Sequence, residues 1–182
     1  MKSPARERLV DTATRLFYRE GLHTVGVDRL VAEASITRAT FYRHFPSKDD
    51  LVVAYLDRVD CDLREAVTAA ATGAAPAEAV EALVGLIGRT VCSANFRGCH
   101  FINASAEYPD PAHSVRQAVE RHRRWFRTTV TELARAAGHP DPDYAGQALS
   151  ILHDGALVCG ELDDPQTISS ALERLVREMF SR

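Results

Sequence analysis

Apolar residues recur along this chain at intervals near 3.6, and no segment shows the apolar–polar alternation of a half-buried β-strand. An interval of 3.6 places such residues on one face of an α-helix. The C-terminal segment is the clearest case, because its apolar residues from Ile168 to Phe180 follow the spacing i, i+3, i+4, i+7 without a gap. We therefore predict an all-α fold with about nine helices.

Proline, glycine and capping residues mark where these helices begin and end. Ser3 and Pro4 can open the first helix, which Gly21 ends. Ser47 with Asp50 resembles a capping box. Residues 93–110 are less regular. The expected helices cover residues 4–20, 27–34, 37–45, 47–70, 76–92, 110–137, 142–159 and the segment after 165. We predict a compact head at residues 1–46 and a larger helical body at residues 47–182, joined by the fourth helix.

Hydropathy argues against a membrane protein. No apolar run approaches the roughly 18 residues that span a bilayer. Charges interrupt the N-terminal residues throughout, so they lack the apolar core of a signal peptide. A cytoplasmic location is therefore expected.

The charge is distributed unevenly along the chain. The net charge is −3, which argues against a general polyanion binder. Residues 1–50 contain nine Lys or Arg and seven Asp or Glu, so this segment is the basic end of an acidic protein. The asymmetry is modest and agrees with a nucleic-acid contact in the N-terminal part.

The cysteines and histidines form no recognisable metal or redox motif. Cys61, Cys92, Cys99 and Cys159 contain no C-x-x-C pair, and buried free thiols are expected. A redox switch through Cys92 and Cys99 stays open as an alternative. The residues His100, Glu107, His113, His122 and His153 are too scattered for i, i+4 metal-ligand spacing, so no metal and no cofactor is expected.

Residues 26–51 read as two short helices joined by a tight turn and followed by the start of a third. On the second short helix, Phe41 and Phe45 lie four residues apart and can pack inward. Thr40 and His44 share a neighbouring face, flanked by Arg38 and Tyr42, and Lys48 follows at the next helix. Such a helix suits the major groove of DNA, so a helix-turn-helix is predicted.

The run ITRATFYRHFPSKDDL resembles the signature of the tetracycline-repressor (TetR) family of bacterial transcriptional regulators. The resemblance covers about a quarter of the chain. It implies that the DNA contacts are Thr37, Arg38, Thr40, Tyr42, His44 and Lys48. The family often has glycine in the turn before the second short helix, where this chain has Ser35. If that turn requires a positive φ, serine carries a strain of roughly 1 kcal/mol.

The resemblance also implies a homodimer formed by the last two helices, at about residues 143–160 and 166–181. The wide apolar stripe of the final helix supports this expectation independently. Small residues on the preceding helix would allow close helix approach: Ala145, Ala148, Ala156 and Gly160. Packing within the protomer is the alternative for both features.

Members of the family respond to a small molecule held in the body. Groups that mix aromatic and sparse polar character, as small-molecule sites do, are concentrated in residues 96–153. The predicted ligand-binding residues are Phe96, Cys99, His100, Asn103, Glu107, His122, Trp125, Phe126 and His153, with Phe101, Tyr108 and Tyr144 as further candidates.

The sequence thus predicts a ligand-responsive transcriptional regulator, most simply a repressor released from a palindromic operator when an unknown effector binds. An activator or a redox-responsive regulator of the same fold is the alternative. No nucleophile–base signature or phosphate-binding loop indicates an enzyme. A protein that organises DNA without sequence preference fits poorly with the acidic body.

Overall fold

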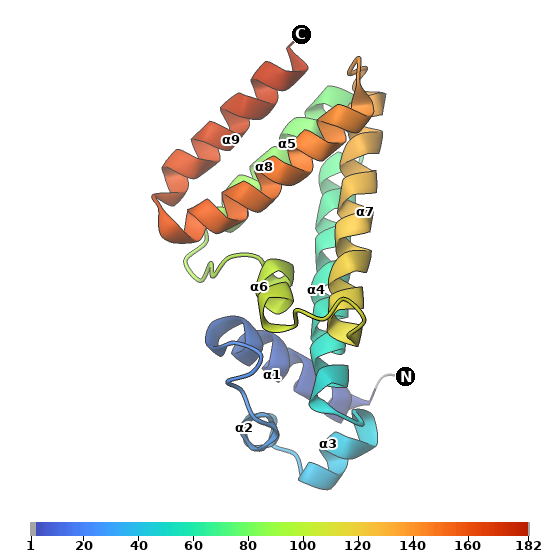
Figure 1. The fold of residues 1–182 in the computed structure, drawn as a ribbon, viewed down its shortest axis with the longest axis vertical. Coiled ribbons are helices and arrows are strands. Elements are labelled where there is room, and N and C mark those ends of the chain that lie inside the picture. The colour runs from blue at the N-terminus through green and yellow to red at the C-terminus, as the bar shows by residue number, and fades with distance from the viewer. Residues whose placement is uncertain (1–2, 182) are drawn as a thin grey trace. The chain divides into compact units, whose positions relative to one another are not determined.

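The computed structural model describes residues 3–181, which form helices and no strand (Figure 1). Within this range, no helix is long and apolar enough to cross a membrane. The helices are α1 (Pro4–Glu20), α2 (Val27–Glu33), α3 (Arg38–His44), α4 (Lys48–Ala71), α5 (Pro76–Val91), α6 (His100–Glu107), α7 (Ser114–Ala136), α8 (Pro142–Leu162) and α9 (Pro165–Phe180). The predicted all-α class is confirmed.

The predicted boundaries hold except around residues 93–114. Helix α6 occupies part of the segment that was predicted to be less regular, because eight residues are too few to show a clear apolar period. Helix α7 begins at Ser114 instead of near Pro111. The backbone N–H of His113 donates to the carbonyl of Asp110 at 3.1 Å, so residues 110–113 form a turn before the helix.

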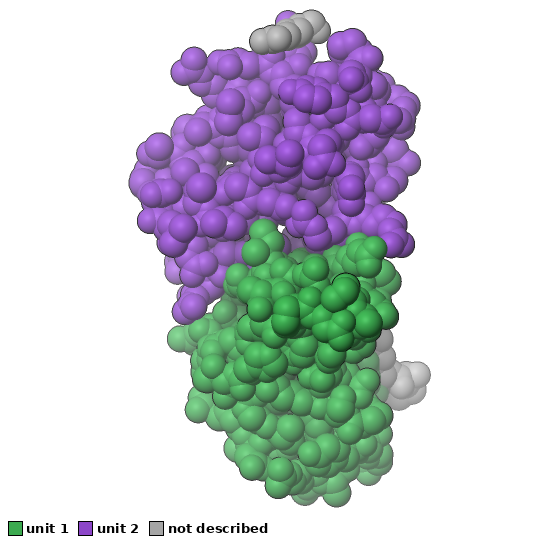
Figure 2. All heavy atoms as spheres, viewed as in Figure 1, with its two compact units in different colours: residues 1–62, 100–121 green, residues 63–99, 122–182 purple. Residues whose placement is uncertain are grey.

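The described residues pack into two compact units, which Figure 2 distinguishes by colour. Unit 1 comprises residues 1–62 and 100–121, and unit 2 comprises residues 63–99 and 122–182. The boundary falls within α4 and within α7, so each of these helices contributes residues to both units. The division at residue 46 into head and body stays a prediction, because packing density does not show which part folds alone.

Unit 1 is built around the apolar faces of α1, α2 and α3. Leu9 and Leu16 of α1 are almost completely buried, as are Leu30 of α2 and Phe41 of α3. Removing such side chains from water is the main source of stability for short helices, since a seven-residue helix is marginal on its own. The two helices that precede α4 are therefore held in place by their contacts with α1.

Unit 2 brings α5, α8 and α9 together at close range. A Cβ atom built at Gly160 of α8 would overlap the side chain of Val91 of α5, and one at Gly88 would overlap Ser169 of α9. Ala145 and Ala156 are also buried within the protomer. The small residues of α8 that were expected to admit a partner helix thus serve packing inside the protomer, with the half-buried Ala148 as the exception.

Candidate nucleic-acid interface and ligand region

The turn between α2 and α3 is a Schellman motif. The N–H of Ser35 donates to the carbonyl of Ala32, and the N–H of Ile36 donates to that of Val31, both at 3.1 Å. Ser35 has φ +50°, the one positive φ of a non-glycine residue within residues 3–181. The condition set out for this turn is therefore met, and serine occupies a position that favours glycine.

Helix α3 starts with a side-chain cap. Thr37 precedes the helix in an extended conformation, and its Oγ1 accepts a hydrogen bond from the N–H of Thr40 at 3.1 Å. The two hydroxyl oxygens also lie 2.9 Å apart. Phe41 and Phe45 are buried on the inner side, and the guanidinium of Arg6 lies 5.0 Å from the centre of the Phe45 ring. Sequence reasoning did not foresee this support by Arg6.

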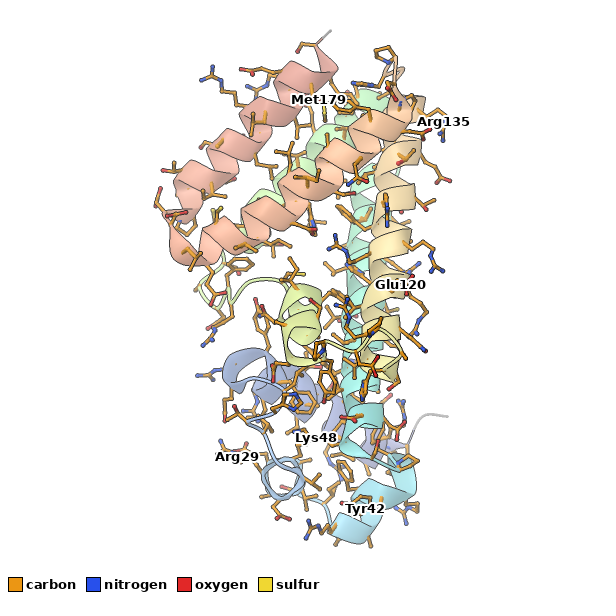
Figure 3. The ribbon with its side chains drawn as sticks, in the orientation of Figure 1. Arg29, Tyr42, Lys48, Glu120, Arg135 and Met179 are labelled. Atoms are coloured by element: carbon orange, nitrogen blue, oxygen red, sulfur yellow. The ribbon has the colours of Figure 1, made fainter. Side chains whose placement is uncertain are left out.

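The outer side of α3 carries the predicted DNA contacts at different exposures. Figure 1 shows α2 nearly end-on and α3 in the plane of view, and Tyr42 is labelled on α3 in Figure 3. The Tyr42 side chain is 48% exposed. Arg38 is exposed, and its guanidinium lies 3.5 Å from the exposed carboxylate of Asp28. An exposed ion pair of this kind is weak, so it would not keep Arg38 from binding a phosphate. His44 is half-buried, with Nε2 3.4 Å from the hydroxyl of Ser3.

Lys48 begins α4, where the predicted capping box is present. The backbone N–H of Asp50 donates to the Ser47 hydroxyl at 3.1 Å, and that of Ser47 donates to the Asp50 carboxylate at 2.9 Å. The Nζ of Lys48 donates to the carbonyl of His23 at 3.5 Å. Burial holds the pKa of Lys48 below its ordinary value, although the carboxylates of Asp49 and Glu107 oppose that shift.

The chemistry of these side chains suits two kinds of DNA contact, one with phosphates and one with base edges. Arg38 and Lys48 supply positive charge, and the hydroxyl of Tyr42 supplies a neutral donor, all suited to phosphate oxygens. The imidazole of His44 and the hydroxyl of Thr40 lie on the same short helix and are of a size to meet base edges in a major groove. The sequence-predicted contacts are thus collected on α3 and the first turn of α4.

The structure divides the predicted ligand-binding residues between the two units. Three belong to unit 1 and lie on α6: His100, Asn103 and Glu107. The ring of His100 stacks on Tyr18 at 3.9 Å between centroids, and its Nδ1 lies 2.5 Å from the Tyr55 hydroxyl. Asn103 is exposed. The side chains of His100 and Glu107 are thus engaged within unit 1, and their predicted role in ligand binding stays a prediction.

Four predicted residues form a ring cluster in unit 2. The centroids of His122 and Trp125 are 5.5 Å apart, those of Trp125 and Phe126 are 6.3 Å apart, and those of Phe126 and His153 are 4.2 Å apart. His122 is buried, in agreement with its place on the apolar stripe of α7. The guanidinium of Arg64 lies over the Trp125 ring at 4.5 Å. Phe96, which is half-buried, and the buried Cys99 lie in the segment before α6.

An ion pair borders this ring cluster and was missed by sequence reasoning. Arg123 donates to the carboxylate of Asp154 at 2.7 Å, and Nδ1 of His153 lies 3.2 Å from the same carboxylate. Burial alone would raise the pKa of Asp154, but the hydrogen bonds from His153 and Arg123 outweigh it, so the pKa lies below its ordinary value. Only the adjacency of His153 and Asp154 in sequence could have indicated this contact.

Two hollows on unit 2 lie away from the ring cluster. One, of about 300 Å³, is lined by α5 and α9, and the other, of about 600 Å³, is lined by α8, α9 and the segment before α8. Of the twelve ligand candidates, Tyr144 lines the second hollow and none lines the first.

Within residues 3–181, the cysteines form neither a disulfide nor a metal cluster. All four cysteines lie within residues 3–181 and none is in a disulfide. Cys61 is exposed, contrary to the expectation of burial, because it falls on the solvent side of α4. Residues 3–181 contain no group of three or more His, Cys, Asp or Glu side chains that could hold a metal ion.

Comparison with known proteins gives matches to the N-terminal residues and to nearly the whole chain. Residues 9–55 match the model of the bacterial regulatory proteins of the tetR family. The chain is 50% identical to SCO4454, a TetR-family transcriptional regulator from Streptomyces coelicolor, with 97% of this chain and 94% of that chain aligned at a TM-score of 0.93.

Curated relatives are more distant. The HTH-type transcriptional regulator LmrA of Bacillus subtilis is 25% identical over 137 residues, which cover 74% of this chain and 73% of LmrA. An uncharacterized HTH-type transcriptional regulator of Mycobacterium tuberculosis is 37% identical over 54 residues, or 30% of this chain. That match spans only 27% of the relative's length.

Proposed function

This chain belongs to the TetR family of bacterial transcriptional regulators, and from that premise we propose that it is a repressor released from a palindromic operator when a small molecule binds unit 2. It is a DNA-binding regulator and not an enzyme. Its DNA target implies that it acts in the cytoplasm, associated with the nucleoid when bound. The observation that carries the proposal is the exposed polar side of α3 above a buried aromatic side.

The proposed DNA contacts are those that the resemblance implies: Thr37, Arg38, Thr40, Tyr42, His44 and Lys48. The exposure of Arg38 and Tyr42 supports this assignment. The placement of Lys48 at a helix N-terminus supports it too, because unpaired backbone N–H groups there favour a phosphate. We assign Arg38, Tyr42 and Lys48 to the DNA backbone. We assign Thr40 and His44 to base edges, because they lie four residues apart and therefore share one face of α3.

We place the dimer contact on α8 and α9. Apart from Tyr42, the exposed large apolar residues within residues 3–181 all lie on these two helices, and they are Tyr144, Ile151, Val158, Leu162 and Leu175. The four on α8 are separated by seven, seven and four residues, so they share one face of the helix. If a second copy covers this face, the resulting dimer carries two heads. A palindromic operator with half-sites about 34–36 Å apart requires two such heads.

The ring cluster of unit 2 supports the ligand part of the proposal. His122, Trp125, Phe126 and His153 combine apolar ring faces with imidazole nitrogens, and Arg64 adds a cation near Trp125. This mixture of aromatic walls and few polar groups is typical of sites for small organic molecules. We propose these residues, with Phe96 and Cys99, as the lining of the effector site.

The DNA part is tested by gel shift on an operator found by selecting genomic fragments with the purified protein. The double variant Tyr42→Ala/Lys48→Ala is expected to bind at least tenfold more weakly, because it loses two phosphate contacts. Arg127→Ala, which removes an exposed charge from α7, is the matched control and is expected to leave binding unchanged. Undiminished affinity in the double variant would show that the contact assignment is wrong.

The ligand part is tested by native mass spectrometry of the purified protein and by the fluorescence of Trp125, the single tryptophan of the chain. A small molecule that co-purifies, changes this fluorescence and releases the operator would support the proposal. Release of the operator with the same molecule by a Trp125→Ala/His153→Ala variant, at undiminished sensitivity, would place the effector elsewhere.

A further inference from the structure

The last residue of α6, Glu107, carries its charge where a helix disfavours it. The C-terminal end of a helix has a partial negative charge, so a carboxylate there is unfavourable. The contacts of Glu107 explain its presence. Its two oxygens accept hydrogen bonds from the backbone N–H groups of Leu22 at 2.8 Å and His23 at 2.7 Å. These bonds hold the segment between α1 and α2 from the end of α6.

The Glu107 carboxylate lies beside Gly21, the residue that ends α1. Gly21 has φ +92°, and a Cβ atom built there would lie 3.5 Å from the nearer Glu107 oxygen. The ring of His23 adds a third bond, in which Nε2 donates to the backbone carbonyl of Glu107 at 2.9 Å. Three hydrogen bonds therefore join the end of α6 to two consecutive residues of the α1–α2 segment.

Tyr108, the next residue, joins the same end of α6 to α4. Its hydroxyl donates to the Asp49 carboxylate at 2.7 Å, and its ring lies between the imidazoles of His23 and His113, at 4.8 and 4.7 Å between centroids. Nε2 of His113 lies 3.3 Å from the other oxygen of Asp49. Burial, together with the Asp49 hydrogen bond, raises the pKa of Tyr108, so the hydroxyl stays a donor at neutral pH.

These contacts converge on a proposed DNA contact. Asp49 directly follows Lys48, and the Nζ of Lys48 donates to the carbonyl of His23, the residue that Glu107 and Tyr108 hold. We propose that Glu107 and Tyr108 are positioning residues for DNA binding: they touch no DNA but fix the α1–α2 segment against the first turn of α4, and thereby set where Lys48 presents its ammonium group.

This inference rests on the proposed DNA contact of Lys48 and differs from the role first predicted for Glu107, which was ligand binding. Each oxygen of the Glu107 carboxylate already accepts one backbone N–H group, which accounts for its charge without an effector. Loss of its charge would leave two donors facing one acceptor and one amide N–H₂ group, so the α1–α2 segment would move. Lys48 would then lose its fixed position while remaining part of α4.

The first experiment compares Glu107→Gln with the matched control Glu132→Gln, an exposed glutamate of α7. Glu107→Gln should weaken operator binding about tenfold, because a charge-assisted hydrogen bond is lost. The control should bind the operator normally. Hydrogen exchange by NMR should show faster exchange of the Leu22 and His23 amides in Glu107→Gln, with the amides of α8 unchanged. Normal operator affinity in Glu107→Gln despite faster exchange at these two amides would overturn the proposal.

A double-mutant cycle separates positioning from general destabilisation. If Glu107 acts through Lys48, then adding Glu107→Gln to Lys48→Ala should weaken binding by much less than tenfold. Fully additive losses would show that Glu107 does not act through Lys48. Tyr108→Phe provides a milder second variant, which retains the ring contacts and loses only the bond to Asp49, and we expect a severalfold loss. Unchanged binding by the Lys48→Ala protein would refute the proposed contact itself, a result distinct from failure of the positioning role.

Discussion

Ser35 is the residue at which this structure makes its sharpest prediction about stability. It occupies the position after the last turn of α2 that a Schellman motif reserves for positive φ, and its φ is +50°. The same motif ends α7, where Gly138 has φ +77° and the N–H of His139 donates to the carbonyl of Ala134 at 3.0 Å. The chain therefore contains a serine and a glycine at equivalent positions of one motif, which allows opposite substitutions to be compared.

The expected effect follows from two opposing contributions. Left-handed backbone costs a residue with a Cβ atom about 1–2 kcal/mol. Glycine removes that cost but raises the entropy of the unfolded chain, which offsets about 0.5–1 kcal/mol. Ser35→Gly should therefore increase the free energy of unfolding by about 0.5–1 kcal/mol, and Gly138→Ser should decrease it by a similar amount. Ser35→Val should be destabilising, because a β-branched side chain tolerates positive φ least.

Urea unfolding followed by circular dichroism measures these changes, with protein concentration held fixed because a dimer's stability depends on it. The thermal midpoint of Ser35→Gly should rise by about 2 °C for a chain of this size. Ser35 is exposed, so no change in core packing complicates the comparison. A Ser35→Gly protein less stable than the parent, or a Ser35→Val protein of equal stability, would refute the argument from backbone strain.

Three further outcomes are expected. Gly160→Ala should destabilise the protein by about 1–3 kcal/mol through overlap with Val91, and Val91→Ala in the same chain should recover part of that loss in urea unfolding. Ile151→Glu should convert the dimer to a monomer in sedimentation, since it puts a charge on the exposed face of α8, whereas Thr128→Glu on α7 should leave the dimer intact. Asp154→Asn should destabilise at pH 7. The pKa of Asp154 is lower in the folded protein than in the unfolded chain, so its carboxylate stabilises the fold at pH values above the unfolded pKa of about 4. The difference in stability between the parent and Asp154→Asn should therefore shrink as the pH falls below about 4 and the carboxyl becomes protonated.

The DNA-reading head could be predicted closely because its signals are local. Pro4 and Gly21 mark the ends of α1, and the Ser47–Asp50 capping box marks the start of α4. The positive φ at Ser35 was raised only as a condition, from the glycine that the family often has in this turn. The predicted boundary failed at α6, where eight residues contain too few turns for a period to be recognised.

The proposed effector region could not be predicted as well, because its members meet only in the folded chain. His122 and Phe126 share a stripe of α7 that periodicity can show, but the contact of Phe126 with His153 depends on how α7 and α8 pack. The contacts of Glu107 could not be predicted either, because no pattern around it indicates a hydrogen bond to residues far earlier in the sequence. The packing of Gly160, Ala145 and Ala156 of α8 inside the protomer, the alternative to a partner helix, could not be chosen from the sequence for the same reason.

The hydroxyl pair at the start of α3 has a consequence for the thermodynamics of DNA recognition. Two hydroxyls have two protons to donate, and the contact between Thr37 and Thr40 uses one of them. The pair can therefore offer a single hydroxyl proton to DNA while both rotamers are already fixed. Ordering side chains on association costs about 0.5–1.5 kcal/mol for each flexible one, and this end of α3 has met that cost during folding. The conformational entropy lost on DNA binding should consequently be smaller at this pair than at the long, exposed Arg38.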